Sequence, residues 1–298
     1  MAAMECYTLD VFTTKPFSGN QLGVVVIPKS NALTQSQKHR LTIEFNYSET
    51  IFISNDDESK PLEYTVGIFT IQGELPFAGH PTIGAGWHLM KRHPNASELV
   101  LHIKAGDVLV RREGDGVRLK VPSDFKTHPN YENPGIKARQ PALGPEDYVD
   151  GASAGIPVAS IVKGMTFYLL EVTSLDALGR FNVSAGDVTI PDGHLGEWKG
   201  FCGLYVFYRC EDESIRVRMF EGKFEDPATG SAASTLCGWL AEQKGDGKWA
   251  FDLVQGVEMG RRSEIKVFVD VEGGKVKNIK LAGTAVQVLE GKIQVPEL

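Results

Sequence analysis

Short apolar runs rich in β-branched residues recur along the chain and alternate with turn-forming residues. This pattern is typical of strands of a few residues that are joined by tight turns. Turns rich in glycine and aspartate begin near residues 113, 191, 244 and 272, and the clearest apolar runs cover residues 22–27, 108–110, 158–162, 215–219 and 265–271. The sequence therefore predicts more strand than helix.

Three segments are predicted to be helical: residues 33–45, which a cap at Asn31 or Thr34 would open, and residues 81–92 and 231–243. The last two are rich in glycine, alanine, leucine and tryptophan and carry almost no charge before their ends. Because a helix that is apolar on all sides must be buried on all sides, each of these two is expected to be enclosed by sheet. The stretch 122–144 breaks the periodicity and is the best candidate for a linker.

An internal repeat indicates how the chain is organised. Two segments that begin at Phe69 and Phe220, 151 residues apart, each run from a strand through Glu-x-Pro-x-x-Gly directly into one of the apolar helices. The same order of elements in both copies favours duplication over chance, and it predicts two similar halves with pseudo-twofold symmetry. Residues shared by the two copies are Phe69/Phe220, Glu74/Glu225, Pro76/Pro227, Gly79/Gly230 and Leu89/Leu240.

Composition and charge argue against several classes of function. The chain has 298 residues, 42% of them hydrophobic, and a formal net charge of −7, so it can form a large core but has no basic footprint for nucleic acid. It shows no signal peptide and no apolar run of membrane-spanning length, so we expect a soluble, cytoplasmic protein without a membrane partner. The cysteines are too few and too irregularly spaced for a disulfide framework or a zinc site and are expected to be reduced: Cys6, Cys202, Cys210 and Cys237.

Both copies of the repeat place a glycine-containing turn directly before a helix N-terminus. The first N–H groups of a helix lack intrahelical partners, and the helix dipole favours negative charge there. Gly79 in one copy and Gly230 with Ser231 in the other could therefore hold a small anion such as a carboxylate. The alternative is that both are ordinary helix starts that use glycine for tight packing, but two such turns in equivalent positions favour a site.

Three titratable residues are candidates for chemistry. His80, at a helix N-terminus, would tend to stay neutral and able to exchange a proton, and a role as helix cap is an equally good interpretation. Asp226, before a proline, could also be a turn former. Glu49 enters an apolar strand, where desolvation would raise its pKa and suit it to general acid–base work; the alternative is a solvated strand entry.

Nothing in the sequence points to a metal or a cofactor. The histidines have no metal-ligand spacing, and the glycine-containing segments match neither a dinucleotide fingerprint nor a nucleophile elbow.

These residues belong to blocks that together resemble the phenazine-biosynthesis PhzF-like family. The blocks follow the family order over essentially the whole chain, and those at 74–82 and 225–232 are quite specific. They are Asp-Val-Phe-Thr at 10–13 with Gly19-Asn20, Ser-Glu-Thr at 48–50, Glu-Leu-Pro-Phe-Ala-Gly-His-Pro-Thr at 74–82, Glu-Asp-Pro-Ala-Thr-Gly-Ser-Ala at 225–232 and Gln-Gly-Val-Glu-Met-Gly-Arg at 255–261.

The resemblance implies an α+β fold like that of diaminopimelate epimerase. This fold has two pseudo-symmetric lobes, each a barrel-like, mostly antiparallel sheet around a central apolar helix, with the site in the cleft between them. In the family the last strand often returns to complete the first lobe. We therefore expect residues 1–123 with about 285–298 to form the first lobe and residues 124–284 to form the second. A homodimer is a further expectation from the family.

The resemblance also implies a cofactor-independent isomerase that moves a proton on a small anionic metabolite bearing a carboxylate. By motif, Glu49 is the family's proton-shuttling glutamate, and His80 and Asp226 orient the substrate and relay protons. Backbone amides around Gly79 and around Gly230 and Ser231 would hold the carboxylate. The leading role of Glu49 rests on the resemblance alone. Related racemases use a cysteine at each helix start; these turns have none, so a two-thiol mechanism is not expected.

The chain departs from the family pattern near its motifs. The family usually has an arginine and a proline around Phe69 and Thr70, where this chain has Gly67 and Ile71, and Arg262 replaces a usual proline. These changes leave the three candidate residues in place and leave the substrate open. The alternative function is a non-catalytic descendant of the same fold that binds a small ligand or a protein partner.

Overall fold

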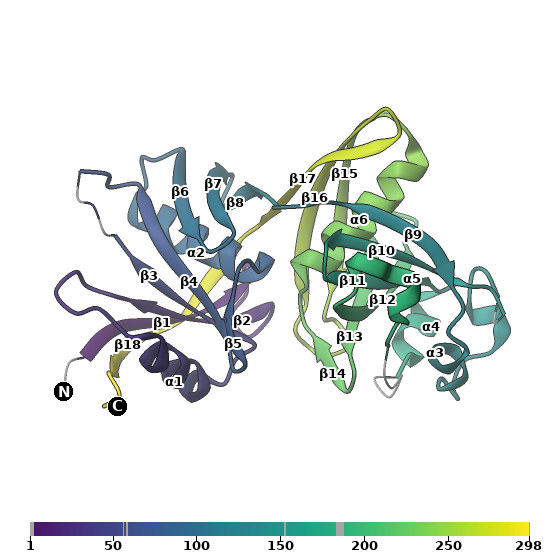
Figure 1. Cartoon of the computed structure of the whole chain (residues 1–298), viewed down its shortest axis with the longest axis horizontal. Coiled ribbons are helices and arrows are strands. Elements are labelled where there is room, and N and C mark those ends of the chain that lie inside the picture. The colour runs from purple at the N-terminus through teal and green to yellow at the C-terminus, as the bar shows by residue number, and fades with distance from the viewer. Residues whose placement is uncertain (1–2, 56, 58, 152, 183–187, 298) are drawn as a thin grey trace. The chain divides into compact units, whose positions relative to one another are not determined.

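The chain divides into two compact units in a computed structural model that describes residues 3–55, 57, 59–151, 153–182 and 188–297 (Figure 1). The first unit comprises residues 1–120 and 281–298, and the second comprises residues 121–280. Both contain helices and strands, which confirms the predicted α+β class. The barrel-like closure of each sheet and the central position of each helix stay predictions.

The first unit is built on a mixed sheet with one long buried helix. Strand β1 lies between β18 and β2, both antiparallel to it; β2 pairs with β3 in parallel, and β3 pairs with β4 antiparallel. β4 pairs with β5 antiparallel and with β6 in parallel, and β6, β7 and β8 follow as an antiparallel meander. The elements are β1 (Ala3–Val11), β2 (Asn20–Val26), α1 (Gln35–Phe45), β3 (Glu49–Ser54), β4 (Glu63–Thr70), β5 (Gly73–Leu75), α2 (Gly79–Arg92), β6 (Glu98–Ile103), β7 (Gly106–Glu113), β8 (Gly116–Lys120) and β18 (Ala285–Gln294).

The second unit repeats this pattern of pairing. β10 lies between β9 and β11, both antiparallel to it; β11 pairs with β12 in parallel, and β12 pairs with β13 antiparallel. β13 pairs with β14 antiparallel and with β15 in parallel, and β15 pairs with β16 antiparallel. The elements are β9 (Lys126–Tyr131), α3 (Pro134–Ala138), η1 (Pro145–Asp147), β10 (Ile156–Val162), β11 (Met165–Glu171), α4 (Leu175–Arg180), α5 (Asp192–Leu195), η3 (Gly196–Trp198), β12 (Phe201–Arg209), β13 (Ile215–Glu221), β14 (Phe224–Asp226), α6 (Gly230–Lys244), β15 (Gly247–Gln255), β16 (Ser263–Glu272) and β17 (Lys275–Gly283).

The three predicted helices form, with boundaries that differ by one or two residues. α1 begins after Thr34. The Thr34 hydroxyl accepts from the backbone N–H of Gln37, and the Gln37 side chain accepts from the backbone N–H of Thr34, so the two residues form a capping box. α2 buries most of its length against strands of the first unit, and α6 does the same in the second. No helix among the described residues is both long and apolar enough to cross a membrane.

The prediction that residues 122–144 form a linker is wrong, because part of this segment belongs to the sheet and to a helix. The segment contains β9, which pairs with β10, and the short helix α3. Most side chains of β9 are exposed, with His128 its buried residue. Because polar residues can occupy an exposed strand, β9 lacks the apolar alternation by which strands are detected in a sequence.

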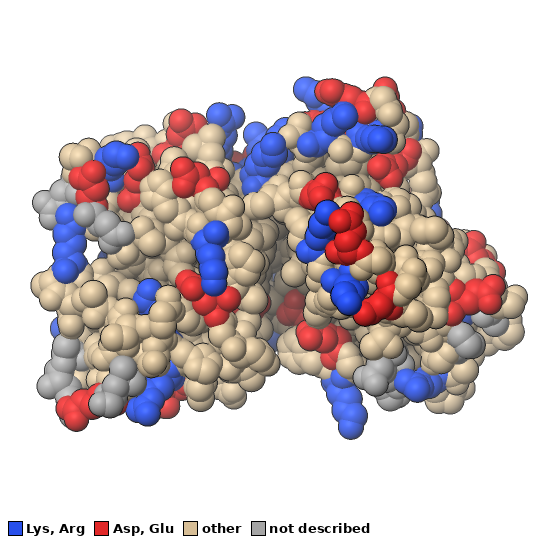
Figure 2. Space-filling view, viewed as in Figure 1, with Lys and Arg blue, Asp and Glu red and all other residues tan. Residues whose placement is uncertain are grey.

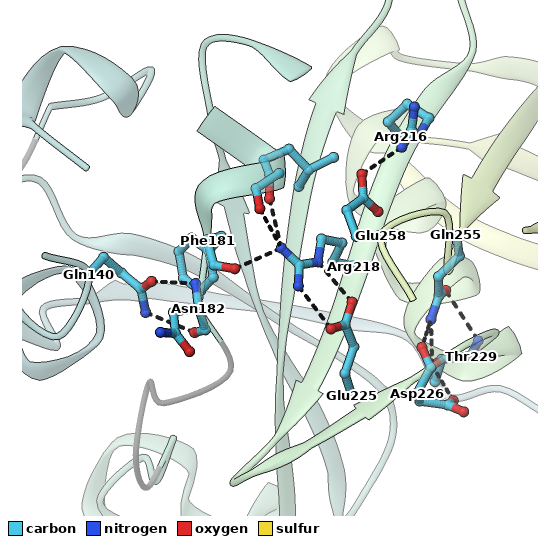
Figure 3. Close-up of polar contacts among 12 residues, drawn as sticks. Gln140, Phe181, Asn182, Arg216, Arg218, Glu225, Asp226, Thr229, Gln255 and Glu258 are labelled. Atoms are coloured by element: carbon cyan, nitrogen blue, oxygen red, sulfur yellow. Dashed lines mark hydrogen bonds and ion pairs between the residues drawn. The ribbon is translucent and has the colours of Figure 1, made fainter. Parts of the chain in front are cut away.

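A buried ion pair ties the β13–β14 hairpin to helix α4 (Figure 3). The Arg218 guanidinium donates from Nε and Nη2 to the two carboxylate oxygens of Glu225, both at 2.8 Å. Nη1 donates to the carbonyl oxygens of Leu178 at 2.9 Å and Phe181 at 2.7 Å, at the end of α4. The side chains of Arg218 and Glu225 are 7% and 10% exposed. Such a pair holds its elements in register, and losing one partner leaves a buried charge.

We expect Glu225→Gln to lower the free energy of unfolding by about 3–5 kcal/mol, because the Arg218 charge stays buried without its counter-ion. The measurement is urea denaturation of the full chain at neutral pH. Glu264→Gln is the matched control, since Glu264 pairs with Arg262 in the same unit but both side chains are exposed, and exposed pairs contribute little. Equal losses in the two variants would contradict a stabilising role for the buried pair.

Two buried histidines make the fold sensitive to acid. Burial, with a smaller effect of the Arg92 charge, lowers the pKa of His88 on α2 to about 4. Burial also lowers the pKa of His128 on β9 to about 4, with Lys126 and His194 adding to the effect. Both residues titrate near pH 6.5 in an unfolded chain. As the pH falls from 6.5 towards 4, these two histidines become protonated in the unfolded state but stay neutral in the folded state. The free energy of unfolding therefore decreases in this pH range.

His88→Leu should reduce this acid sensitivity. We expect the loss of unfolding free energy between pH 6.5 and 4 to be smaller in the variant by about 3 kcal/mol, while the share of His128 remains. The measurement is the urea midpoint at several pH values in that range. A pH dependence identical to that of the wild type would show that His88 is not held neutral in the fold.

Candidate active site

Three polar side chains of the first unit meet near the N-terminus of α2, and we call Asn20, Glu49 and His80 the Glu49 cluster. His80 is the second residue of α2, and Asn20 and Glu49 begin β2 and β3. The parallel pairing of these two strands, with Leu22 opposite Glu49, brings their first residues to the same end of the sheet. The sheet register therefore brings together residues that are separated by up to 60 positions.

The imidazole of His80 lies between a carboxylate and an amide. His80 Nδ1 is 3.6 Å from Glu49 Oε2 and 3.5 Å from Asn20 Nδ2. His80 and Asn20 are 5% and 3% exposed, and the Glu49 side chain is 17% exposed. When Nδ1 is unprotonated it can accept from the Asn20 amide, and when protonated it can donate towards Glu49. Glu49 and His80 thus lie side by side in a largely buried pair.

The start of α2 gives backbone N–H groups to this region. Helix α2 begins at Gly79, and its N-cap, Ala78, makes no side-chain capping bond. The alternative role of His80 as the helix cap is therefore wrong. The first N–H groups of a helix, at Gly79 and just after it, lack intrahelical acceptors and suit an anion. The predicted role of Gly79 in binding substrate stays a prediction.

Asp226 belongs to a separate group in the second unit (Figure 3). We call Tyr205, Asp226, Thr229 and Gln255 the Asp226 cluster. The Thr229 hydroxyl donates to Asp226 Oδ2, and the Gln255 side chain bonds to the Asp226 carbonyl oxygen at 2.7 Å and to Thr229 Oγ1 at 3.0 Å. Gln255 is fully buried at the end of β15, while Asp226 and Thr229 are partly exposed. A turn-forming aspartate would make the same contact with Thr229. Both interpretations of Asp226, as a catalytic residue and as a turn former, therefore stay predictions.

Gly230 and Ser231 begin the second long helix. Thr229 is the N-cap of α6 but makes no capping bond, because its hydroxyl is directed to Asp226. Gly230 is buried and Ser231 is partly exposed. Both helices that follow the repeat thus begin without a side-chain cap, which leaves their first amides to another acceptor. That this acceptor is a substrate carboxylate is untested.

The predicted site residues therefore fall into two groups. Glu49, His80 and Gly79 lie together in the first unit, and Asp226, Gly230 and Ser231 lie together in the second. The residue-by-residue interpretation missed Asn20, Tyr205, Thr229 and Gln255 as parts of these groups. Asn20, Thr229 and Gln255 had membership of the family-like blocks as their only signal, and Tyr205 had none, because the contacts depend on strands and turns that are distant in sequence.

Burial keeps the thiols of Cys6, Cys202 and Cys237 protonated. All four cysteines are free, and burial raises the pKa of Cys6, raises that of Cys202 to about 12 and raises that of Cys237 well above its usual range. A protonated, buried thiol is a poor base. Among the described residues, no group of three histidine, cysteine or acidic side chains is arranged to hold a metal ion.

Comparison with known proteins settles the family. The family model described as phenazine biosynthesis-like protein matches residues 9–291. The chain belongs to the phenazine biosynthesis-like family. The resemblance inferred from the sequence blocks is thereby confirmed.

Several curated relatives of this phenazine biosynthesis-like protein are named as isomerases. It is 32% identical to an uncharacterized isomerase of Mesorhizobium japonicum, over 95% of this chain and 96% of that protein. It is 28% identical to the trans-2,3-dihydro-3-hydroxyanthranilate isomerase of Pseudomonas aeruginosa, over 95% of this chain and 97% of that one. These relatives support an isomerase-type function.

A solved structure shows the same fold. A PhzF-family phenazine biosynthesis protein of Bacillus anthracis matches with a TM-score of 0.79 at 24% identity, covering 99% of this chain and 100% of the other. A hydroxyproline epimerase of Agrobacterium vitis matches more distantly, with a TM-score of 0.58 at 13% identity and coverage of 98% and 92%. The fold of this family member is therefore shared with an epimerase.

Proposed function

We propose that this protein is a cofactor-independent isomerase that moves a proton on a small carboxylate-bearing metabolite by general acid–base catalysis. The observation that carries the proposal is the Glu49 cluster, in which a carboxylate and an imidazole lie 3.6 Å apart and are both largely buried. A relative at 28% identity is named for an isomerisation, which supports the same class of reaction.

Glu49 is the proton shuttle in this proposal. Its carboxylate takes a proton from one substrate carbon, the electrons of that C–H bond shift the double bond, and the proton returns to another position of the same molecule. The atoms balance without a second substrate. Glu49 is largely buried beside His80, so its carboxylate is shielded from bulk water while it acts as the base. His80 relays or stabilises the proton through its contact with Glu49.

Anion binding is assigned to the helix starts. The first amides of α2, around Gly79, and those of α6, at Gly230 and Ser231, would hold the substrate carboxylate and any negative charge that develops. Asp226 would orient the substrate from the second unit. The proposal requires that groups from both units act on one substrate, and variants in each unit should therefore impair the same reaction.

The proposal predicts that Glu49→Gln abolishes proton transfer while the protein stays folded. In D2O, a panel of unsaturated cyclic acids that begins with trans-2,3-dihydro-3-hydroxyanthranilate is followed by proton NMR for both conversion and deuterium uptake. Loss of a general base typically costs 10²–10⁴-fold in rate, so we expect at least a hundredfold decrease in Glu49→Gln. His80→Gln and Asp226→Asn should decrease the same rate.

Glu44→Gln is the matched control, because Glu44 lies exposed on α1 in the same unit, and its rate should equal that of the wild type. Acids that bind to the wild type with neither conversion nor exchange would favour the non-catalytic alternative. An active Glu49→Gln variant would remove Glu49 from the shuttle role.

A further inference from the structure

The side-chain amide of Gln255 uses all of its hydrogen-bonding capacity within the Asp226 cluster, and Figure 3 shows its contacts with Asp226 and Thr229. Its Oε1 accepts from the Tyr205 hydroxyl at 3.0 Å and from the Thr229 backbone N–H at 3.2 Å. Its Nε2 donates to the Asp226 backbone oxygen at 2.7 Å and to Thr229 Oγ1 at 3.0 Å. An amide has two donors and two acceptor positions, so Gln255 is saturated.

Backbone partners remove the usual ambiguity between amide oxygen and nitrogen. The Thr229 N–H can only donate, so the atom facing it must be Oε1, and the Asp226 carbonyl oxygen can only accept, so the atom facing it must be Nε2. The same Nε2 faces Thr229 Oγ1, which therefore has to accept. The Thr229 hydroxyl keeps one proton to donate, and in the structure it donates to Asp226 Oδ2.

We propose that Gln255 and Thr229 are positioning residues that hold Asp226 as a hydrogen-bond acceptor, so that in the resting protein it is an ionised carboxylate that takes rather than gives a proton. The role of Asp226 towards a substrate rests on the proposed function. Because a hydroxyl that donates to a carboxylate favours the ionised form, the cluster prepares Asp226 to receive a hydroxyl or ammonium donor of the substrate.

The other copy of the repeat supports a dedicated role for this cluster. At the four equivalent places of the first unit, the strand registers and the 151-residue offset put apolar side chains in place of all four polar ones. If the four polar residues only packed the loop, the same loop in the first copy would be expected to have polar residues too. The corresponding pairs are Tyr205 and Ile51, Asp226 and Leu75, Thr229 and Ala78, and Gln255 and Ile103.

The charges around Asp226 are largely compensated among themselves. Arg218 of β13 pairs with Glu225 of β14, and Arg216 of β13 pairs with Glu258, which follows β15. Burial raises the pKa of the Tyr205 phenol on β12 well above its usual range, so this group stays protonated as a donor to Gln255. Thr229 donates to the Asp226 carboxylate, so its removal should act on Asp226 directly.

The test titrates Asp226 itself, without substrate. The full chain is labelled with ¹³C at the aspartate carboxyl carbons, and the Asp226 signal is assigned by its loss in Asp226→Asn. We expect Thr229→Val to raise the pH midpoint of this signal by about one unit, a tenfold change in its acid dissociation constant. Thr229→Ser keeps the hydroxyl and should restore the wild-type midpoint. Gln255→Leu, which frees the hydroxyl to turn away, should raise the midpoint in the same direction.

Thr229→Ala supplies a second deletion of the hydroxyl should valine disturb the turn, and the urea midpoint of each variant reports folding. An Asp226 midpoint that is unchanged in both deletions, or a Thr229→Ser variant that behaves like Thr229→Val, would overturn the proposal. Because no substrate is used, the result is independent of the exchange experiment on Glu49. If the isomerase proposal fails, the Asp226 midpoints of the variants are still valid. If the titration fails, the exchange experiment on Glu49 is unaffected.

Discussion

Each unit depends on one pair of parallel strands that are not neighbours in sequence, β4 with β6 and β13 with β15. Parallel strands cannot be joined by a tight turn, so the chain between them must cross from one end of the sheet to the other. In both units that crossing consists of a short returning strand and a long helix, β5 with α2 and β14 with α6. The helix start therefore always follows a β-hairpin, and the motif residues lie at that junction.

The crossing also explains the composition of the two helices. They are rich in glycine although glycine weakens a helix, because neighbouring strands approach them closely. A Cβ added at Gly84 would lie 2.3 Å from Leu22 Cδ2 on β2, and one at Gly238 would lie 2.6 Å from the ring of Phe125, which directly precedes β9. Charge is absent until the helix ends because nearly every position is buried. On the surface, by contrast, acidic and basic side chains are interspersed over the described residues visible in Figure 2.

Much of the fold could be predicted, because the local pattern of apolar and polar residues and the internal repeat indicate it. The three predicted helices and the main strands follow from periodicity, and the family, with the α+β class that the resemblance implies, follows from the motif blocks. Strand β9 could not be detected, because its exposed side chains lack alternation. The partners within the site were also hidden. Asn20 meets His80 across 60 residues and Gln255 meets Asp226 across 29, and such contacts depend on register rather than on local sequence.

The two copies of the repeat have diverged in ways that the sequence alone left open. In the second unit Arg218 pairs with Glu225 and lies over the Phe220 ring, whereas the first unit has Gly67 at the equivalent position. There Glu74 lies 3.6 Å from the exposed Lys104, and Lys38 of α1 is the cation near the Phe69 ring. The departure at Gly67 thus changes how the β4–β5 hairpin is held and leaves the residues of the Glu49 cluster intact.

Divergence of this kind is what a duplicated scaffold permits. The strand pairing and the helix start are common to both copies, and they supply the same backbone amides twice. Side chains at the junction are then free to differ, with the Glu49–His80 contact in one copy and the saturated Gln255 network around Asp226 in the other. An isomerisation needs a group that carries the proton and a group that holds the substrate against it. Two copies of one junction can specialise for these two tasks, since neither change disturbs the pairing on which both depend.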